Sequence, residues 1–196
     1  MICGEGGALL VNDRKYVERA EIIREKGTNR ARFFRGQVDK YTWVDFGSSY
    51  LPSDLLAAFL LAQLEVADTI QGKRQHIWNC YAAGLCDWAA AHGVQLPTVP
   101  AHCAQPYHMF YLILPTPAQR QALIEHLKIR GIMAVFHYLP LHVSPMGLKF
   151  DGQPGQCPVT ESVSDRLVRL PFFNDLSEPD QALVVESVCA FNPGTD

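Results

Sequence analysis

The chain has 196 residues, which is enough for one large domain or two small ones. Hydrophobic residues make up 48% of it and charged residues 19%, a composition that excludes a disordered chain and predicts a conventional apolar core. The formal net charge of -3 provides no overall attraction for nucleic acid or for anionic lipid, so we expect neither as a partner.

The N-terminal part of the chain predicts a short strand followed by a helix. A glycine-rich turn at residues 4–7 leads into four apolar residues, 8–11, which are typical of a strand. Asp13 is a favourable N-cap for a helix that reaches Lys26, and Gly27 would end that helix. A single strand after a glycine turn rarely opens a domain, so we expect further chain before it.

Residues 28–52 show no periodicity and interleave basic with aromatic side chains. A loop of this length is more often functional than not. Arginine and lysine neutralise phosphates and aromatic rings stack on bases, so the loop suits a nucleotide diphosphate. A solvated loop that covers a dimer interface is the alternative. At the end of the loop, Ser48 and Ser49 beside the next helix N-terminus suit a phosphate cup, and an ordinary capped helix is the alternative there.

Residues 54–91 predict one long helix with Ser53 as its N-cap. Its first half, 55–66, is apolar nearly all round, so we expect that half to be buried and the second half to be more exposed. The two glycines inside the helix, Gly72 and Gly84, are candidate bends.

From about residue 94 the pattern predicts a small α+β domain with an antiparallel or mixed sheet. The expected elements are a strand at 107–113, a helix that opens with the capping box 116–119 and ends at Gly131, a strand at 132–136, an irregular segment at 140–158, a helix near 161–166, and a last helix capped by Ser177. Inward-facing helix residues are expected at Ala122, Leu123, Leu127, Leu183, Val184 and Val188.

Two imidazoles flank a turn in the segment 137–142, directly after a predicted strand. Because Pro140 prevents a continuous helix and no Asp, Glu or Cys lies within three residues, the spacing is poor for a metal, and we expect no metal site. Hydrogen bonding to a substrate by His137, Tyr138 and His142 is the expected role.

Six cysteines are scattered along the chain without a CxxC pair. Three disulfides are an alternative, but a chain of this size builds its own core, so we expect reduced and mostly buried thiols in a cytoplasmic protein. The longest apolar run, 55–64, is too short to span a bilayer, and the first residues lack the basic start and apolar stretch of a secretory signal.

Several short motifs, weak one by one, occur together in a specific order. They are Gly4-Glu5-Gly6-Gly7, Arg24-Glu25-Lys26-Gly27-Thr28-Asn29-Arg30, Asp39-Lys40-Tyr41-Thr42-Trp43, Gly47-Ser48-Ser49-Tyr50-Leu51, His108-Met109-Phe110-Tyr111, Phe136-His137-Tyr138-Leu139-Pro140-Leu141-His142 and Arg169-Leu170-Pro171. As a set covering residues 4–190, they resemble the nucleotide-sugar aminotransferases among the fold type I pyridoxal-phosphate (PLP) enzymes.

The resemblance implies an α/β fold class, namely the C-terminal part of a PLP-dependent transferase fold. It divides the chain into 1–52, the end of the large PLP-binding domain with its substrate loop; 53–93, a long connecting helix; and 94–196, a small α+β domain. For the intact enzyme it implies a homodimer and transfer of an amino group from L-glutamate to C4 of dTDP-4-keto-6-deoxyglucose, with PLP as cofactor.

The resemblance also assigns roles to individual residues. Ser49 stands where many relatives contact the cofactor phosphate of the neighbouring subunit, although Leu51 and Pro52 replace the more usual Arg and Met. The expected nucleotide contacts are Arg30, Lys40 and Tyr41, and the expected sugar contacts are Tyr138 and His142.

The family's Schiff-base lysine lies a few residues before the Gly-Glu-Gly-Gly turn, where this sequence has Met1-Ile2-Cys3. The first lysine, Lys15, falls in the following helix and should face solvent. We therefore expect a C-terminal portion of the enzyme, cut just after its key residue and unable to transaminate alone. The alternatives are a non-catalytic remnant and a nucleotide-sugar binding module that uses no cofactor.

Overall fold

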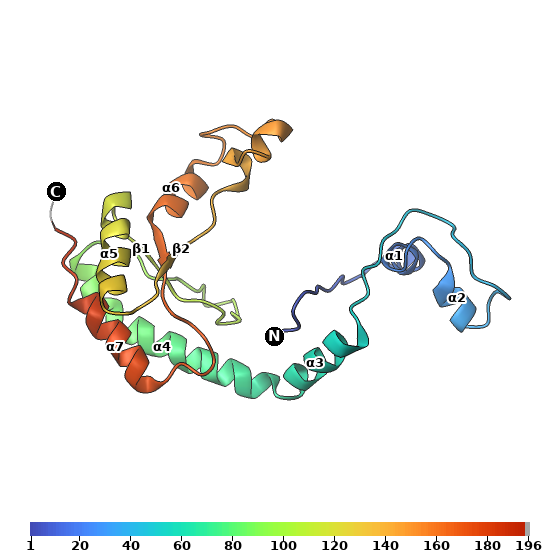
Figure 1. The fold of residues 1–196 in the computed structure, drawn as a ribbon, viewed down its shortest axis with the longest axis horizontal. Coiled ribbons are helices and arrows are strands. Elements are labelled where there is room, and N and C mark those ends of the chain that lie inside the picture. The colour runs from blue at the N-terminus through green and yellow to red at the C-terminus, as the bar shows by residue number, and fades with distance from the viewer. Residues whose placement is uncertain (195–196) are drawn as a thin grey trace. The chain divides into compact units, whose positions relative to one another are not determined.

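The computed structural model describes residues 1–194, and the chain divides into two units, Met1–Ala67 and a second that begins at Asp68 (Figure 1). The division falls at the start of α4 (Ala67–Ala91), which follows α3 (Asp54–Glu65). The sequence pattern joined these two helices into one. That prediction was wrong: the helix ends at Val66, whose β-branched side chain has low helix propensity and whose φ and ψ are -114° and 23°. The two glycines expected to bend the helix lie inside α4.

The first unit contains η1 (Arg14–Tyr16), α1 (Val17–Arg24), α2 (Arg30–Phe34) and α3. Asp13 caps η1 as predicted, because its carboxylate accepts a hydrogen bond of 3.0 Å from the backbone N–H of Lys15. The chain turns after α1 at Gly27, whose φ of +73° is in the left-handed region. A Cβ on Gly27 would also collide with the carbonyl oxygen of Asp45, so this turn requires glycine.

The strand expected at residues 8–11 does not form. Leu9 and Leu10 are 77% and 83% exposed, and no strand pairs with this segment among the residues that the structure describes. A strand requires a neighbour to satisfy its backbone groups, which an apolar run alone does not supply. The stretch 28–52, predicted as an irregular loop, contains the short helix α2. Two isolated bridges also hold its backbone, Glu25 with Ser49 and Thr28 with Trp43.

Helix α3 begins as predicted but its burial was predicted wrongly. The Ser53 hydroxyl accepts a hydrogen bond of 3.3 Å from the backbone N–H of Leu56 and so caps the helix. None of the α3 side chains is buried within the unit. The exposed large apolar residues of this helix and its C-cap are Leu55, Phe59, Leu61, Leu64 and Val66.

The second unit is built on a small antiparallel sheet whose strand order is β1-β3-β2. Its elements are α4, β1 (Tyr111–Ile113), α5 (Pro117–Ile129), β2 (Val135–Phe136), η2 (Leu141–Val143), η3 (Gly147–Phe150), α6 (Pro158–Arg166), β3 (Leu167–Arg169) and α7 (Glu178–Cys189). The central strand β3 was not predicted, although its Val168 pairs with Leu112 on one side and with Phe136 on the other. The antiparallel sheet expected for this part of the chain is confirmed.

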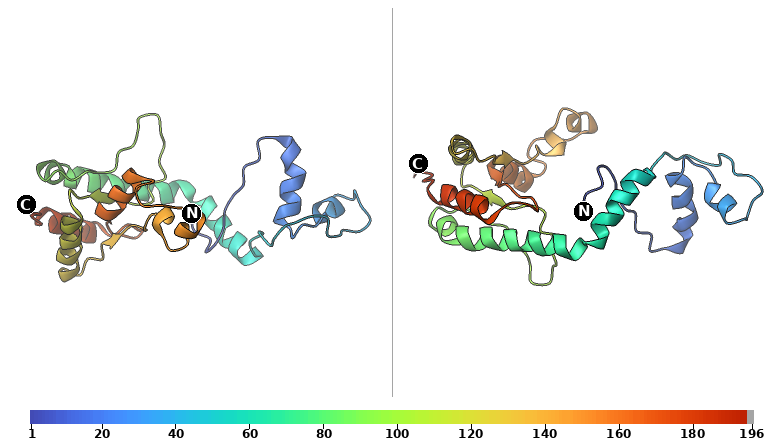
Figure 2. Two further views of the ribbon diagram at one scale, coloured as in Figure 1. Left: turned by 90° about the horizontal axis from the view of Figure 1, so that it is seen from above. Right: turned by 60° about the horizontal axis from the view of Figure 1, so that its bottom comes forward.

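The core of the second unit lies between the sheet and helices α4, α5 and α7. Helix α7 lies along α4 (Figure 2), where the Gln181 side chain donates a 2.7 Å hydrogen bond to the Ile77 carbonyl. Tyr81 of α4 is fully buried, its hydroxyl donates to the Pro171 carbonyl at 2.9 Å, and burial raises its pKa. Helix α4 therefore carries much of the core, whereas the sequence pattern placed that burial in α3.

The caps predicted for the last two long helices are confirmed. Thr116 and Gln119 form a reciprocal capping box at the start of α5, and the Ser177 hydroxyl accepts from the Asp180 N–H at the start of α7. The predicted inward faces are correct for Leu123, Leu127, Val184 and Val188, but Ala122 and Leu183 are exposed. Caps depend on neighbouring residues, whereas the last positions of a buried face depend on the angle at which a partner packs.

The six cysteines are free thiols, and none of them is buried. The expectation of mostly buried thiols was wrong: the core is filled by larger aliphatic and aromatic residues, and no cysteine belongs to it. Taken singly, no helix in residues 1–194 has the length and apolarity to cross a membrane; α3 and α4 meet that test only together, as a bent pair.

Candidate functional site

The six residues predicted to bind cofactor or substrate fall into two groups. Arg30, Lys40, Tyr41 and Ser49 belong to the first unit, and Tyr138 and His142 belong to the second. Each group has its own geometry within its own unit.

Arg30, the first residue of α2, is held among aromatic rings. Its guanidinium carbon lies 5.1 Å from the ring centroid of Phe34 and 5.7 Å from that of Tyr41, and its Nη1 donates to the Glu25 carboxylate at 2.9 Å. Phe33 meets Tyr41 edge to face at 5.6 Å. A planar cation stacked on aromatic rings is suited to a phosphate or a base, and here it is already oriented by a carboxylate.

The other cations of the loop differ in whether they are already used. Arg35 forms a two-pronged pair with Glu21 of α1 at 2.9 and 2.8 Å, which lowers the pKa of that carboxyl, and Arg32 pairs with Glu18 at 3.4 Å. These two arginines fasten α2 to α1. Lys40 is exposed and makes no ion pair among the described residues, so its charge is available to a ligand.

Ser49 lies in a turn that backbone contacts hold tightly. It bridges to Glu25, and a Cβ on Gly47 would collide with the Gly27 nitrogen. Ser49 is exposed, whereas the Ser53 hydroxyl is occupied by its cap. A mostly apolar hollow of about 770 Å³ opens beside this turn; its lining residues are Gly7, Ala8, Leu9, Val11, Val17, Ala20, Glu21, Ile23, Arg24, Tyr50, Leu51 and Pro52.

The second group is organised by a residue that the sequence pattern did not single out, Glu161 of α6. Its carboxylate lies 2.9 Å from the Nε2 of His142 and accepts from the backbone N–H of Gly155 at 2.9 and 3.0 Å and of Cys157 at 3.3 Å. These contacts, the one with His142 first, lower the pKa of Glu161. The sequence feature that could have indicated Glu161 is its place in the first turn of a helix that follows an irregular segment.

Tyr138 and His137 differ in what they offer a substrate. Tyr138 is 74% exposed, and the Arg169 guanidinium carbon lies 5.7 Å from its ring centroid. The His137 ring packs against Tyr138, with 5.4 Å between centroids, and its Nδ1 is buried without a hydrogen-bond partner among the described residues. Tyr138 is therefore the more accessible of the two for a substrate.

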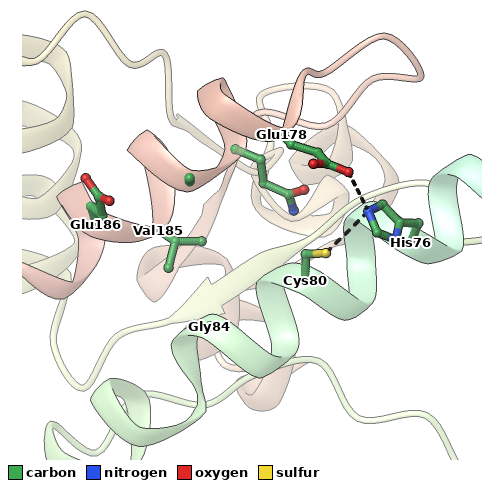
Figure 3. Close-up of a pocket in the computed structure, with 8 residues that line it drawn as sticks. His76, Cys80, Gly84, Glu178, Val185 and Glu186 are labelled. Atoms are coloured by element: carbon green, nitrogen blue, oxygen red, sulfur yellow. Dashed lines mark hydrogen bonds and ion pairs between the residues drawn. The ribbon is translucent and has the colours of Figure 1, made fainter.

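A second hollow, of about 480 Å³ between α4 and α7, contains a cysteine, a histidine and a glutamate (Figure 3). The Nε2 of His76 lies 3.6 Å from the Cys80 sulfur and 3.7 Å from a Glu178 oxygen. A catalytic histidine takes a proton at one ring nitrogen and is oriented through the other. Because both contacts here meet at the same nitrogen, the three residues are not arranged as a nucleophilic triad.

Comparison with known proteins places this geometry in a family. The model of the DegT/DnrJ/EryC1/StrS aminotransferase family matches residues 1–189. The chain belongs to this family. The sequence was expected to resemble nucleotide-sugar aminotransferases. The family match and the sugar transaminases among the relatives confirm that resemblance at the level of sugar aminotransferases.

Three relatives show how far this likeness extends. The dTDP-3-amino-3,4,6-trideoxy-alpha-D-glucose transaminase of Streptomyces venezuelae is 27% identical over 186 residues, which cover 94% of this chain and 45% of the relative. The GDP-perosamine synthase of Escherichia coli O157:H7 is 26% identical over 189 residues, covering 96% and 48%. The crystal structure of S. venezuelae DesV with a ketimine intermediate aligns with a TM-score of 0.77 and 26% identity, covering 92% and 45%.

These likenesses cover nearly all of this chain but only part of each relative. The chain spans about half the length of the curated DegT/DnrJ/EryC1/StrS relatives it matches. The expected fold class, a part of an α/β PLP-dependent transferase fold, is confirmed. Spr1654 of Streptococcus pneumoniae, solved in PMP and PLP forms, shares this fold at 18% and 17% identity.

Ser49 and Lys15 differ in how well they suit a PLP site. Ser49 is an exposed hydroxyl suited to a phosphate oxygen. Lys15 is the first lysine, but its amine pairs with the Asp13 carboxylate at 2.8 Å, which raises its pKa, and its side chain is 64% exposed. An amine that attaches a cofactor must be available unprotonated, which an exposed, carboxylate-paired lysine is not. Lys15 therefore does not fit the covalent attachment of PLP.

Proposed function

We propose that these residues form substrate-binding surfaces of a nucleotide-sugar aminotransferase. The observation that carries the proposal is the stacking of Arg30 on Phe34 and Tyr41 in a chain of this family, with the unpaired cation of Lys40 in the same loop. Arg30 and Lys40 would contact the diphosphate and Tyr41 the base. Ser49 would contact the cofactor phosphate.

The sugar would be bound by Tyr138 and His142, whose polar groups suit the hydroxyls of a hexose. The reaction of the complete enzyme would move an amino group from L-glutamate to C4 of dTDP-4-dehydro-6-deoxy-D-glucose. The product would be dTDP-4-amino-4,6-dideoxy-D-galactose, as used in polysaccharides such as enterobacterial common antigen. When bound, PLP supplies the electron sink for this transfer. We place this enzyme, as a homodimer, in the cytoplasm.

A second candidate is a nucleotide-sugar binding module without catalysis, and the state of Lys15 favours it for these 196 residues taken alone. Calorimetric titration of the chain with dTDP tests the binding that both candidates share. We expect dTDP and the dTDP-sugar to bind saturably. We expect GDP to compete only weakly with dTDP. If neither dTDP nor the dTDP-sugar gave a heat of binding, that result would contradict the proposed substrate contacts. It would favour a remnant that binds neither ligand.

A further inference from the structure

His142 is held from two directions within the second unit. Its backbone is enclosed by two glycines, since a Cβ on Gly147 or on Gly152 would collide with the carbonyl oxygen of Leu141 or of His142. Its side chain, 16% exposed, is held by the Glu161 carboxylate, 2.9 Å from Nε2. The ring is therefore fixed in place before any substrate arrives.

The same contacts determine which ring nitrogen can accept a hydrogen bond. A carboxylate accepts and does not donate, so the nitrogen that faces Glu161 must carry a proton. In the neutral imidazole only one nitrogen carries a proton, which leaves Nδ1 with a lone pair. Among the described residues Nδ1 of His142 has no hydrogen-bond partner, and it is not one of the buried unpartnered atoms.

Glu161 is itself fixed, because the backbone N–H groups of Gly155 and Cys157 donate to it. Its carboxylate thus connects the start of α6 to the irregular segment that follows β2. It contacts His142 in the first part of that segment and Gly155 and Cys157 near its end. A carboxylate that is held by two amides cannot rotate away from the imidazole without losing those bonds.

We propose that Glu161 is a positioning residue of the sugar-binding site: it holds neutral His142 as the Nε2–H tautomer and thereby presents Nδ1 as an acceptor for a hydroxyl of the hexose ring. The tautomer follows from the geometry alone, and the hexose as the source of the hydroxyl rests on the proposed function. A site that accepts from a hydroxyl discriminates against a deoxy sugar at that carbon, since the acceptor would be left unpaired.

The tautomer is measured on the 196-residue chain by long-range proton–nitrogen NMR of nitrogen-labelled histidine, at about pH 8.5, where an ordinary imidazole with a pKa of about 6.5 is neutral. The His142→Gln variant assigns the signal. We expect a pyrrole-like Nε2 whose proton is protected from solvent exchange, and a pyridine-like Nδ1. In Glu161→Ala the signal of the Nε2 proton should disappear through exchange with solvent. The chemical shifts of Nδ1 and Nε2 should then move toward each other.

Two further variants separate positioning from mere folding. Glu161→Gln keeps a carbonyl oxygen that can accept from Nε2–H, so it should restore the protected proton. Asp165→Asn, on the exposed side of the same helix, should leave the spectrum of the original chain unchanged. A proton on Nδ1, or an Nε2 proton that is equally protected in Glu161→Ala, would overturn the inference.

Calorimetry with dTDP and with dTDP-4-keto-6-deoxyglucose then connects the tautomer to the sugar. We expect Glu161→Ala to lose the extra affinity of the sugar nucleotide and to keep the affinity for dTDP. Equal loss for both ligands would overturn the assignment to the sugar. If the original chain binds neither ligand, the proposed function fails, while the NMR result still decides the role of Glu161.

Discussion

The Arg30 guanidinium donates to the Glu25 carboxylate and lies over the Phe34 ring. Replacing Arg30 by Gln should weaken dTDP binding about 10-fold, because a hydrogen bond to a charged group contributes about 1.5–3 kcal/mol and part of it is spent on the carboxylate. Calorimetric titration measures the change. Arg32→Gln, on the same helix but paired with Glu18, is the control and should change the affinity little; an equal loss would contradict a specific role for Arg30.

The lowered pKa of Glu161 makes its contacts sensitive to acid. A carboxyl whose pKa is lower in the folded chain stabilises the fold above its ordinary value of 4.5, and that contribution is lost as the pH falls through the lowered value. We therefore expect the amide protons of Gly155 and Cys157 to lose their protection from exchange below pH 4.5. In Glu161→Gln the protection should not depend on pH in this range. Loss of protection at the same pH in both chains would contradict the assignment.

Helix α5 depends on the reciprocal bonds of its capping box. Thr116→Ala removes the acceptor for the Gln119 N–H, 3.2 Å away, and should lower the free energy of unfolding by about 0.5–2 kcal/mol. Urea denaturation monitored by circular dichroism measures this change. Thr116→Ser keeps the hydroxyl and should retain most of the stability, so an equally large loss in Thr116→Ser would show that the methyl group, and not the cap, is responsible.

Helix α3 presents large apolar side chains to solvent on several sides, among them Leu55 at 83% and Phe59 at 52% exposure. Extended apolar surface promotes association. Replacing Leu55 and Phe59 together by Gln should reduce self-association of the 196-residue chain, as measured by sedimentation at fixed concentration. Ile129→Gln, at an equally exposed site on α5, is the control. Unchanged sedimentation of the double variant would contradict this role of α3.

The elements that were predicted correctly are those whose cause is local. Ser53, Thr116 and Ser177 cap their helices through bonds to residues three positions away, so the sequence pattern contains both partners. The two strand errors, the strand expected at 8–11 and the missed strand β3, have a non-local cause. Each depends on partners distant in sequence: the first finds none among the described residues, and β3 pairs with β1 and β2.

The candidate site was predictable to the same degree. The family resemblance indicated Arg30 and Tyr41 within the basic and aromatic stretch 28–43, and the structure places them together, with 5.7 Å from guanidinium carbon to ring centroid. Glu161 was not found because its importance comes from a fold that returns it to His142, nineteen positions earlier. The residue pattern at 137–142 and the family resemblance both indicated His142, but neither indicated the carboxylate that orients it.

At the scale of the whole molecule, each unit carries its own group of predicted binding residues. The first carries Arg30 against the Phe34 ring, and the second carries a histidine fixed by a carboxylate. Lys15 does not fit attachment of PLP, since its amine is paired with the Asp13 carboxylate. The division of the complete fold into 1–52, 53–93 and 94–196 stays a prediction.

The most direct test is an assay of the purified 196-residue chain with PLP, L-glutamate and dTDP-4-keto-6-deoxyglucose. We predict amino-sugar formation no faster than with free PLP at the same concentration, because Lys15, paired with Asp13, does not fit attachment of the coenzyme. Formation of the amino sugar over many turnovers, above that background and abolished by Lys15→Arg, would contradict the account.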